Sequence, residues 1–211
     1  MDYPIASRVF SFFCSPFLGK CNGISNIPRD RGAIIAANHS SYLDHFIVGC
    51  NIVSKLNKSA RFLAKKEHFD TFFQRQWHKY LNAIPIDRES SGKEALSKAI
   101  LHLKKNGLIM IYPEGTRTLT GKMNRAKTGI ARLALAAKVP VIPMGITNTF
   151  KILPKGKNIP KFGIKSDLNI GKPLYFNEYY GKENDKEMIR KVTTIIMKEI
   201  AKLAKQKYEY D

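Results

Sequence analysis

Two imidazoles and a carboxylate lie close together in the stretch ANHSSYLDH, at positions 37–45. His39 and Asp44 are five positions apart, and on a regular helix this spacing would place them about 140° apart, nearly on opposite faces. They can meet only if His39 lies on a turn and Asp44 in the first turns of the following helix. An aspartate bonded to one imidazole nitrogen fixes the tautomer, so that the other nitrogen can act as a general base. The spacing therefore allows a His–Asp base at a strand-to-helix turn.

No obvious nucleophile accompanies this pair. The sequence has no G-x-S-x-G motif, and its three cysteines lie outside the polar stretches that could form a site. His39 would then act on a hydroxyl supplied by a substrate, which predicts direct attack by an acceptor without an acyl-enzyme. A metal site is not expected, because Ser41 stands where an H-x-H-x-D-H pattern needs histidine. We expect His45 to pack or to face solvent.

A second polar stretch, IYPEGTRT, follows another apolar run at 108–110. Gly115 allows the backbone to turn or to approach a ligand closely. Arg117 can bind a phosphate through two parallel hydrogen bonds, and Arg88, after the apolar run AIPID, could join it. Taken alone, the segment favours a turn that holds a local ion pair between Glu114 and Arg117.

Apolar runs rich in Ile and Val alternate with helical patterns along the chain. This alternation predicts a single α/β domain, with a largely parallel central sheet flanked by helices. We expect strands at 33–37, 61–64, 83–87, 108–112, 139–146 and 167–171. We expect helices at 45–56, 67–81, 91–106 (with a Ser91/Glu94 capping box), 125–138 and from about 184 onward.

The polar stretches NHSSYLD, DRESS and PEGTRT directly follow the first, third and fourth of these strands. Right-handed crossovers bring the carboxyl ends of parallel strands to one edge of a sheet, where ligand sites form. We therefore expect one site built from all three stretches. Within the fifth strand, Pro140 and Pro143 predict a position near an edge or a bulge, because proline has no backbone N–H.

The four segments NHSSYLD, IPIDR, YPEGTR and VPVIP occur in this order. Together they resemble the PlsC-type glycerolipid acyltransferases, the family of 1-acyl-glycerol-3-phosphate acyltransferases, from about Gly32 to Ile146. The resemblance implies transfer of a fatty acyl group from acyl-CoA or acyl-carrier protein to the free hydroxyl of 1-acyl-glycerol-3-phosphate, giving phosphatidic acid. The thioester would be a co-substrate, with no cofactor. An enzyme for another lysophospholipid or lipid acceptor would share these motifs, so that alternative stays open.

The resemblance also implies a role for each matching residue. His39 would deprotonate the acceptor hydroxyl, and Asp44 would orient His39 and stabilise its charge. Arg88 matches the arginine of the second motif, which contacts the acceptor phosphate. That match rests mainly on Arg88, because the segment LNAIPIDR lacks the Gly and Phe often found there. Three residues match the third motif, assigned to acceptor binding: Glu114, Gly115 and Arg117. The residues that match supporting parts of the motifs are Asn38, Pro113, Lys127, Gly129, Pro140 and Pro143.

The charge of the chain indicates its partners. Lys and Arg number 36 against 17 Asp and Glu, a net charge of +19, which suits phosphates, nucleic acid or anionic lipid. A nucleic-acid-binding module would explain the charge, but not the His, Asp, Glu and Arg residues at strand ends, and no recognition motif is visible. Six lysines lie from Lys151 to Lys172, with one acid, Asp167. We expect them to hold the active face on an anionic membrane surface, and we expect no nucleic acid.

The first thirty residues are rich in aromatic side chains, as in VFSFFCSPFLG at 9–19. This run is too short to span a bilayer, and no basic signal-peptide region precedes it. We divide the chain into a segment 1–30, either an interfacial anchor or a first helix on the core, and an acyltransferase domain, 31–211. Three cysteines without a close-spaced pair fit a reducing compartment. We therefore expect a cytoplasmic protein bound peripherally to the inner face of the cell membrane.

Overall fold

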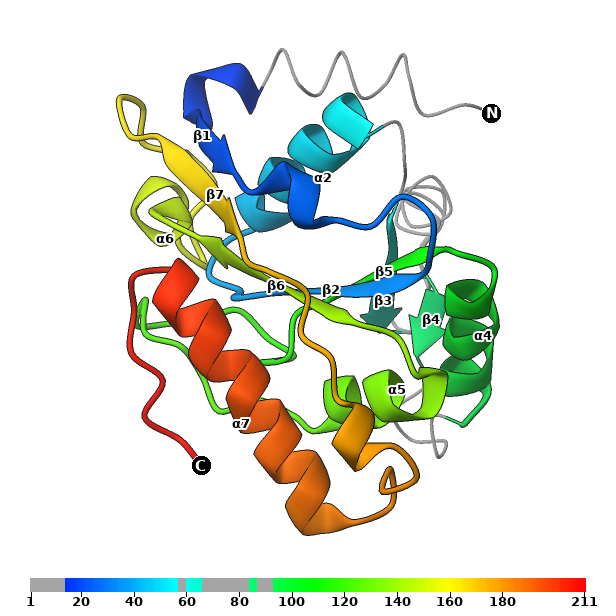
Figure 1. Ribbon diagram of the computed structural model, residues 1–211. Helices are drawn as coiled ribbons and strands as arrows, with labels where there is room; N and C mark the ends of the chain where they lie inside the picture. Colours follow the sequence, from blue (N-terminus) through cyan, green and yellow to red (C-terminus); the bar gives the residue numbers. More distant parts are fainter. Residues whose placement is uncertain (1–13, 57–59, 66–83, 87–92) are drawn as a thin grey trace.

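The apolar run AIIAA forms strand β2 (Ala33–Ala37), in which every residue is buried. A continuous apolar run of this kind is typical of a strand covered on both faces. Strand β2 is the middle strand of a seven-stranded sheet with the order β1-β7-β6-β2-β5-β3-β4, drawn in the computed structural model of Figure 1. The structure describes residues 14–56, 60–65, 84–86 and 93–211.

The sheet is parallel except at one pair of strands. Strand β2 is parallel to both its neighbours, β5 and β6, whereas β7 runs antiparallel to β6. The prediction of an α/β domain with a largely parallel sheet is confirmed, and each expected strand is present with bounds shifted by no more than two residues. The strands are β1 (Leu18–Asn22), β2 (Ala33–Ala37), β3 (Ala60–Lys65), β4 (Ile84–Ile86), β5 (Leu108–Ile111), β6 (Val141–Ile146) and β7 (Ser166–Ile170).

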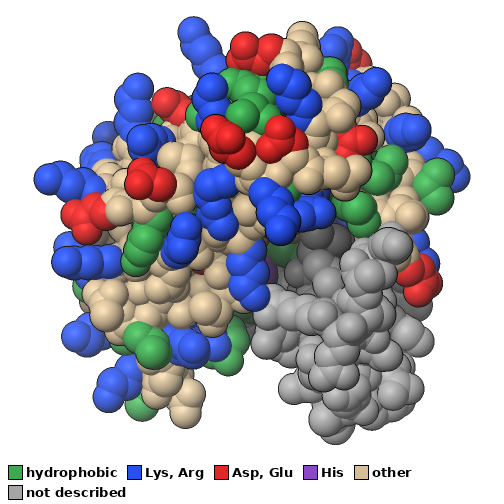
Figure 2. Space-filling model, turned by 90° about the horizontal axis from the view of Figure 1, so that it is seen from below, with side chains coloured by type: hydrophobic (Ala, Val, Ile, Leu, Met, Phe, Trp, Pro, Cys, Tyr) green, Lys and Arg blue, Asp and Glu red, His purple; other side chains and the backbone are tan. Residues whose placement is uncertain are grey.

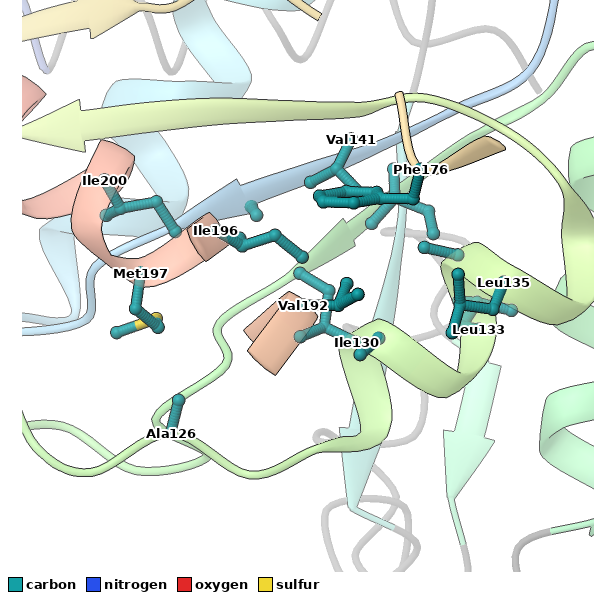
Figure 3. Packing of buried hydrophobic residues seen from close by; sticks show 14 of the residues in the cluster. Ala126, Ile130, Leu133, Leu135, Val141, Phe176, Val192, Ile196, Met197 and Ile200 are labelled. Atoms are coloured by element: carbon teal, nitrogen blue, oxygen red, sulfur yellow. The ribbon is translucent and has the colours of Figure 1, made fainter. Parts of the chain in front are cut away.

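Helices cover both faces of the sheet (Figure 1). Helix α2 packs on one face, and α4, α5 and α7 lie on the other. Figure 3 shows Val192 and Ile196 of α7 directed toward Ile130 of α5, and all three are almost completely buried. The helices are α2 (Leu43–Leu56), α4 (Lys93–Lys104), α5 (Gly129–Ala137), α6 (Thr149–Ile152) and α7 (Lys186–Leu203). Short 3-10 turns occur at η1 (Ser15–Phe17), η2 (Ile24–Asn26) and η4 (Asn177–Tyr179).

One expected helix begins later than predicted, and another lies in a part of the chain that the structure does not describe. Helix α5 begins at Gly129 rather than at position 125, because tertiary contacts hold the residues before it. The backbone N–H of Ala126 donates to the hydroxyl of Tyr208, and that of Lys127 donates to the carbonyl of Pro113. The helix expected at 67–81 lies outside the described residues, as does Ser91 of the expected capping box.

The expectation that Pro140 and Pro143 mark a strand near an edge or with a bulge is wrong. Strand β6 lies inside the sheet, between β7 and β2, and its register with β2 runs without a shift. The carbonyl of Pro143 accepts from the N–H of Gly171 and therefore points toward the β7 side. In a strand the N–H and the carbonyl of one residue point to the same side, so the N–H that Pro143 lacks would also face β7. Strand β7 ends there at Ile170 and pairs with β6 only from Met144 onward. Pro143 therefore interrupts no strand pairing.

Part of the predicted segment 1–30 belongs to the sheet. Strand β1 pairs in parallel with β7, and Phe17 is buried beside Leu43 and Ile152. Residues 1–13 lie outside the described residues, so the anchor role stays a prediction. In the described part of the chain, no helix combines the length and the apolar character that crossing a membrane requires.

Candidate active site

The turn that follows β2 is fixed to the neighbouring strand by Asn38. Its side-chain oxygen accepts from the backbone N–H of Ile146 at 2.8 Å, and its side-chain nitrogen donates to the carbonyl of the same residue at 2.9 Å. Asn38 is buried, and these two bonds replace the strand pairing that ends with β2. The turn therefore leaves the sheet from a fixed point, which sets the position of the next residue, His39.

His39 and Asp44 are in contact, with His39 on the turn and Asp44 in the first turn of α2, as predicted. The distance from His39 Nδ1 to Asp44 Oδ2 is 2.8 Å, and the carboxylate is completely buried. Asp44 Oδ2 also accepts from the backbone N–H groups of Ser40 and Ser41, and Oδ1 accepts from the hydroxyl of Thr149. These four bonds offset the cost of burying the charge.

The contact determines which imidazole nitrogen is available. A carboxylate can only accept, so His39 Nδ1 carries the hydrogen and Nε2 is left as an acceptor. Both nearby serine hydroxyls are already engaged. Ser40 Oγ bonds to Thr149 Oγ1 at 2.9 Å, and Ser41 Oγ donates to the carbonyl of Leu153 at 2.7 Å. Both serine hydroxyls are thus directed to partners other than His39, which fits a base acting on an external hydroxyl.

Tyr112 packs against His39 and was not identified from the sequence. The two rings are stacked, with centroids 4.0 Å apart and an interplanar angle of 17°. His45 lies edge-on to both rings, so the expectation that it packs is confirmed. Burial raises the pKa of the Tyr112 phenol well above its ordinary value, and the charge of Asp44 adds to this effect. Tyr112 therefore stays neutral and holds the imidazole by its face.

Glu114 holds the backbone of His39. Its Oε1 accepts from the backbone N–H of His39 at 2.8 Å, and Oε2 accepts from that of Asn124 at 2.6 Å. The side chain is buried, and the backbone N–H of Thr118 donates to the carbonyl of His39. Both carboxylate oxygens therefore bind backbone groups and position the turn of His39, while the acceptor contact implied by the resemblance stays a prediction.

Burial raises the pKa of Glu114 to about 7, and the charge of Asp44 contributes in the same direction, although the N–H groups of Asn124 and His39 oppose the shift. The folded chain thus binds this proton more tightly than the unfolded chain. The resulting stability is fully present below the ordinary pKa of 4.5 and is lost as pH rises through about 7. We expect Glu114→Gln to remove this dependence, which is on the order of 2–3 kcal/mol.

The measurement is urea denaturation of both proteins between about pH 5 and about pH 8. The free energy of unfolding of the native chain should fall relative to that of Glu114→Gln as pH rises. Parallel curves for the two proteins would contradict the raised pKa.

Arg117 lies beside the turn that carries His39, one residue before Thr118, whose N–H donates to the His39 carbonyl. Its guanidinium carbon lies 3.3 Å from the centre of the Tyr42 ring, a cation–π contact that fixes the side chain. Within the described part of the chain, its Nη1 has no hydrogen-bond partner although it is buried. A buried donor without a partner is rare in native proteins, so Nη1 has a hydrogen available for a ligand.

The other predicted site residues are distributed unevenly. Gly115 adopts the left-handed region with φ of 69°, which lets the loop turn back after Glu114.

The carbonyl of Pro113 accepts from Lys127, so these two residues join the loop to the start of α5 at Gly129. Pro143 lies within β6, and Pro140 precedes that strand at the opposite end of the sheet from His39. Arg88 lies outside the described residues. Among those that are described, no group of three or more His, Cys, Asp or Glu could hold a metal ion.

Three residues of the site were not predicted from the sequence, namely Tyr112, Tyr42 and Thr149, and the sequence marks them to different degrees. Ile111 pairs with Ala36 across the parallel ladder, so Tyr112 falls beside the turn once the register is known. Tyr42 lies between His39 and Asp44 in the sequence, and this position alone indicates that it is near the site. Thr149 belongs to the short helix after β6, and no local pattern marks it as a partner of Asp44.

This chain is similar to known acyltransferases in sequence and fold. Residues 19–147 match a family model described as Acyltransferase. The chain is 32% identical over 151 residues to the 1-acyl-sn-glycerol-3-phosphate acyltransferase of Bacillus subtilis, which covers 71% of this chain and 70% of that protein. It is 29% identical to a chloroplastic 1-acyl-sn-glycerol-3-phosphate acyltransferase of Arabidopsis thaliana, over 64% of this chain and 37% of the plant protein. The crystal structure of the 1-acyl-sn-glycerophosphate acyltransferase PlsC from Thermotoga maritima superposes with a TM-score of 0.70, at 28% identity, over 96% of this chain and 78% of that chain.

Proposed function

The chain belongs to the acyltransferase family, and from this premise we propose that it acylates the free hydroxyl of 1-acyl-glycerol-3-phosphate to give phosphatidic acid. The acyl donor is a thioester, either acyl-CoA or acyl-carrier protein. The bacterial relatives are named for this acceptor. The observation that carries the proposal is the 2.8 Å contact between His39 Nδ1 and the buried Asp44 at the carboxyl end of the central strand.

The contacts of His39 support a direct transfer. Nε2 takes the proton of the acceptor hydroxyl while the hydroxyl oxygen attacks the thioester carbonyl carbon. The carbon–sulfur bond then breaks, and the departing thiolate takes the proton from the imidazolium. Asp44 stabilises the imidazolium and holds its orientation. The reaction needs no acyl-enzyme and no cofactor, because the attacking oxygen belongs to the acceptor.

Arg117 is proposed to bind the phosphate of the acceptor. A phosphate can receive two parallel hydrogen bonds from one guanidinium, and the Nη1 group of Arg117 is free to donate. The Tyr42 ring holds the guanidinium before the acceptor arrives, which lowers the entropy lost on binding. Arg88 is proposed as a second phosphate contact.

We expect Arg117→Ala to raise the KM for the acceptor about 10–100-fold, because it removes a charge-assisted contact worth about 1.5–3 kcal/mol. The KM for the acyl donor should change little. Initial-rate kinetics with each substrate varied in turn will measure both constants. Arg132→Ala, an exposed arginine on α5, is the matched control. An unchanged acceptor KM would exclude Arg117 as the phosphate ligand.

The proposed function is tested by incubating the purified chain with a labelled acyl donor and a panel of lysolipids. Acylation of 1-acyl-glycerol-3-phosphate in preference to the others is expected. Preference for another lysophospholipid would favour the alternative acceptor, and no acylation of any lysolipid would contradict the proposal. Running acyl-CoA and acyl-carrier protein in parallel will identify the donor.

The place of action is also part of the proposal. The acceptor and the product are bilayer lipids, and the chain carries a net charge of +19. We propose that it acts from the cytoplasm, peripherally bound to the inner face of the cell membrane, where anionic lipids attract basic proteins.

A further inference from the structure

Exposed large apolar side chains gather on the loops around His39. Of those in the described residues, Tyr42, Leu119, Ile159 and Phe162 lie on three loops that join at the catalytic turn. Tyr42 belongs to that turn. The loop of Leu119 is bonded to it through Thr118 and the carbonyl of His39. Three further exposed apolar side chains lie in other parts of the described chain, namely Leu101, Tyr175 and Tyr210. The four around His39 form the group next to the site.

The longest of these loops, 153–165, is firmly held at its base. Ser41 Oγ donates to the carbonyl of Leu153 at 2.7 Å, and Lys161 closes the loop by donating its N–H to the carbonyl of Ile152 at 2.8 Å. Leu153 and Ile164 pack against the buried cluster of Phe17, Leu43 and Ile152. The loop therefore has a fixed position relative to His39.

Two large apolar side chains of this loop are exposed, Ile159 and Phe162. Ile159 is 82% exposed and Phe162 is 70% exposed. One face of Phe162 contacts the ring of Phe17, with centroids 5.2 Å apart, which orients it without burying it. Both side chains therefore remain largely accessible to a partner.

The charges on the loop have a single sign. Between Asn148 and Ser166 every charged residue is a lysine, and all are exposed: Lys151, Lys155, Lys157, Lys161 and Lys165. The face below the sheet differs, because Figure 2 shows Lys and Arg mixed with Asp and Glu there. Helix α7, for example, has Glu187 next to Lys186 and Glu199 next to Lys198. The loop is thus a local positive surface.

We propose that loop 153–165, with Leu119 beside it, docks the catalytic end of the sheet on an anionic lipid bilayer. Ile159 and Phe162 enter the boundary between head groups and acyl chains, and the lysines bind the phosphates around them. This inference rests on the proposed function, whose acceptor and product are bilayer lipids. Protruding apolar side chains fit a fluid bilayer, whereas a protein partner such as an acidic carrier protein would need to supply a matching pocket.

The apolar contribution is tested with the double variant Ile159→Ser/Phe162→Ser. Sedimentation with vesicles of phosphatidylcholine and phosphatidylglycerol should show binding weakened roughly tenfold or more, since two interfacial anchors are lost. The matched control is Leu101→Ser, which replaces an exposed leucine on α4 and should bind as the native chain does. Native binding by the double variant would overturn the proposal.

The charge contribution is tested independently with Lys155→Gln/Lys157→Gln/Lys161→Gln. Binding to anionic vesicles should fall about fivefold for each lysine at low salt, and less at high salt. The control triple variant Lys182→Gln/Lys186→Gln/Lys198→Gln removes the same charge from exposed sites around α7 and should bind almost normally. Equal losses in both triple variants would show a general charge effect and overturn the proposal. If the double variant does not fold, the two triple variants still test the docking proposal.

Activity measurements separate docking from catalysis. The double variant should acylate a short-chain, monomeric acceptor at the native rate, but an acceptor embedded in vesicles at least several-fold more slowly. Loss of activity only with acyl-carrier protein as donor, with vesicle binding intact, would identify a carrier-protein surface and overturn the proposal. A native chain that binds vesicles through this loop but acylates no lysolipid would contradict the proposed function alone.

Discussion

Replacement of His39 by alanine is expected to lower kcat about 10²–10⁴-fold, the usual contribution of a general base. The fold should survive, because the turn does not depend on the imidazole. Asn38 holds the turn to Ile146, and Asp44 holds the backbone N–H groups of Ser40 and Ser41. The measurement is kcat at saturating acceptor and donor, together with thermal unfolding followed by circular dichroism.

The matched control is His102→Ala. His102 lies on α4, and its carbonyl accepts from Gly107 just before β5 begins, at the opposite end of that strand from Tyr112. This variant should keep native kcat. Asp44→Asn should lose activity as His39→Ala does. It should also lose stability, because the buried amide nitrogen of asparagine would face hydrogen-bond donors where the carboxylate accepted from them. A folded His39→Ala protein with most of its activity would show that another group takes the proton.

Local spacing allowed the contact between His39 and Asp44, because both residues lie within one turn and the start of its helix, and the family resemblance implied the pair. The buried strands were also predictable, since residues in β2 and β5 are apolar over their whole length. Strand β1 was not, because its sequence LGKCN has no alternating pattern. It lies at the edge of the sheet and pairs with β7, about 150 residues away along the chain.

Contacts between distant segments determine the rest of the site. Glu114 is 75 positions from His39 and Thr149 is 105 positions from Asp44, and no periodicity in one sequence reports such pairs. The family resemblance identified Glu114 as a site residue, but not the backbone N–H that it binds. The start of α5 was mispredicted for a related reason, since Lys127 bonds to Pro113 instead of joining the helix.

Glu114 is expected to affect catalysis through the position of His39. Glu114→Ala would leave the buried N–H groups of His39 and Asn124 without their acceptor, a cost of about 1–3 kcal/mol for each. The turn would then shift, and a displacement of about 1 Å at a catalytic group can cost roughly 10²-fold in rate. We therefore expect a fall of about 100-fold in kcat at saturating substrates.

The division of the effect between kcat and KM distinguishes this role from acceptor binding. A residue that positions the base should lower kcat and leave the acceptor KM close to native, whereas an acceptor ligand should raise KM. Glu114→Gln keeps one accepting oxygen for the two N–H groups and should retain an intermediate kcat. The control is Glu94→Ala, whose exposed pair with Lys98 contributes little to stability. A raised acceptor KM with native kcat in Glu114→Ala would contradict the positioning role and return Glu114 to the acceptor site.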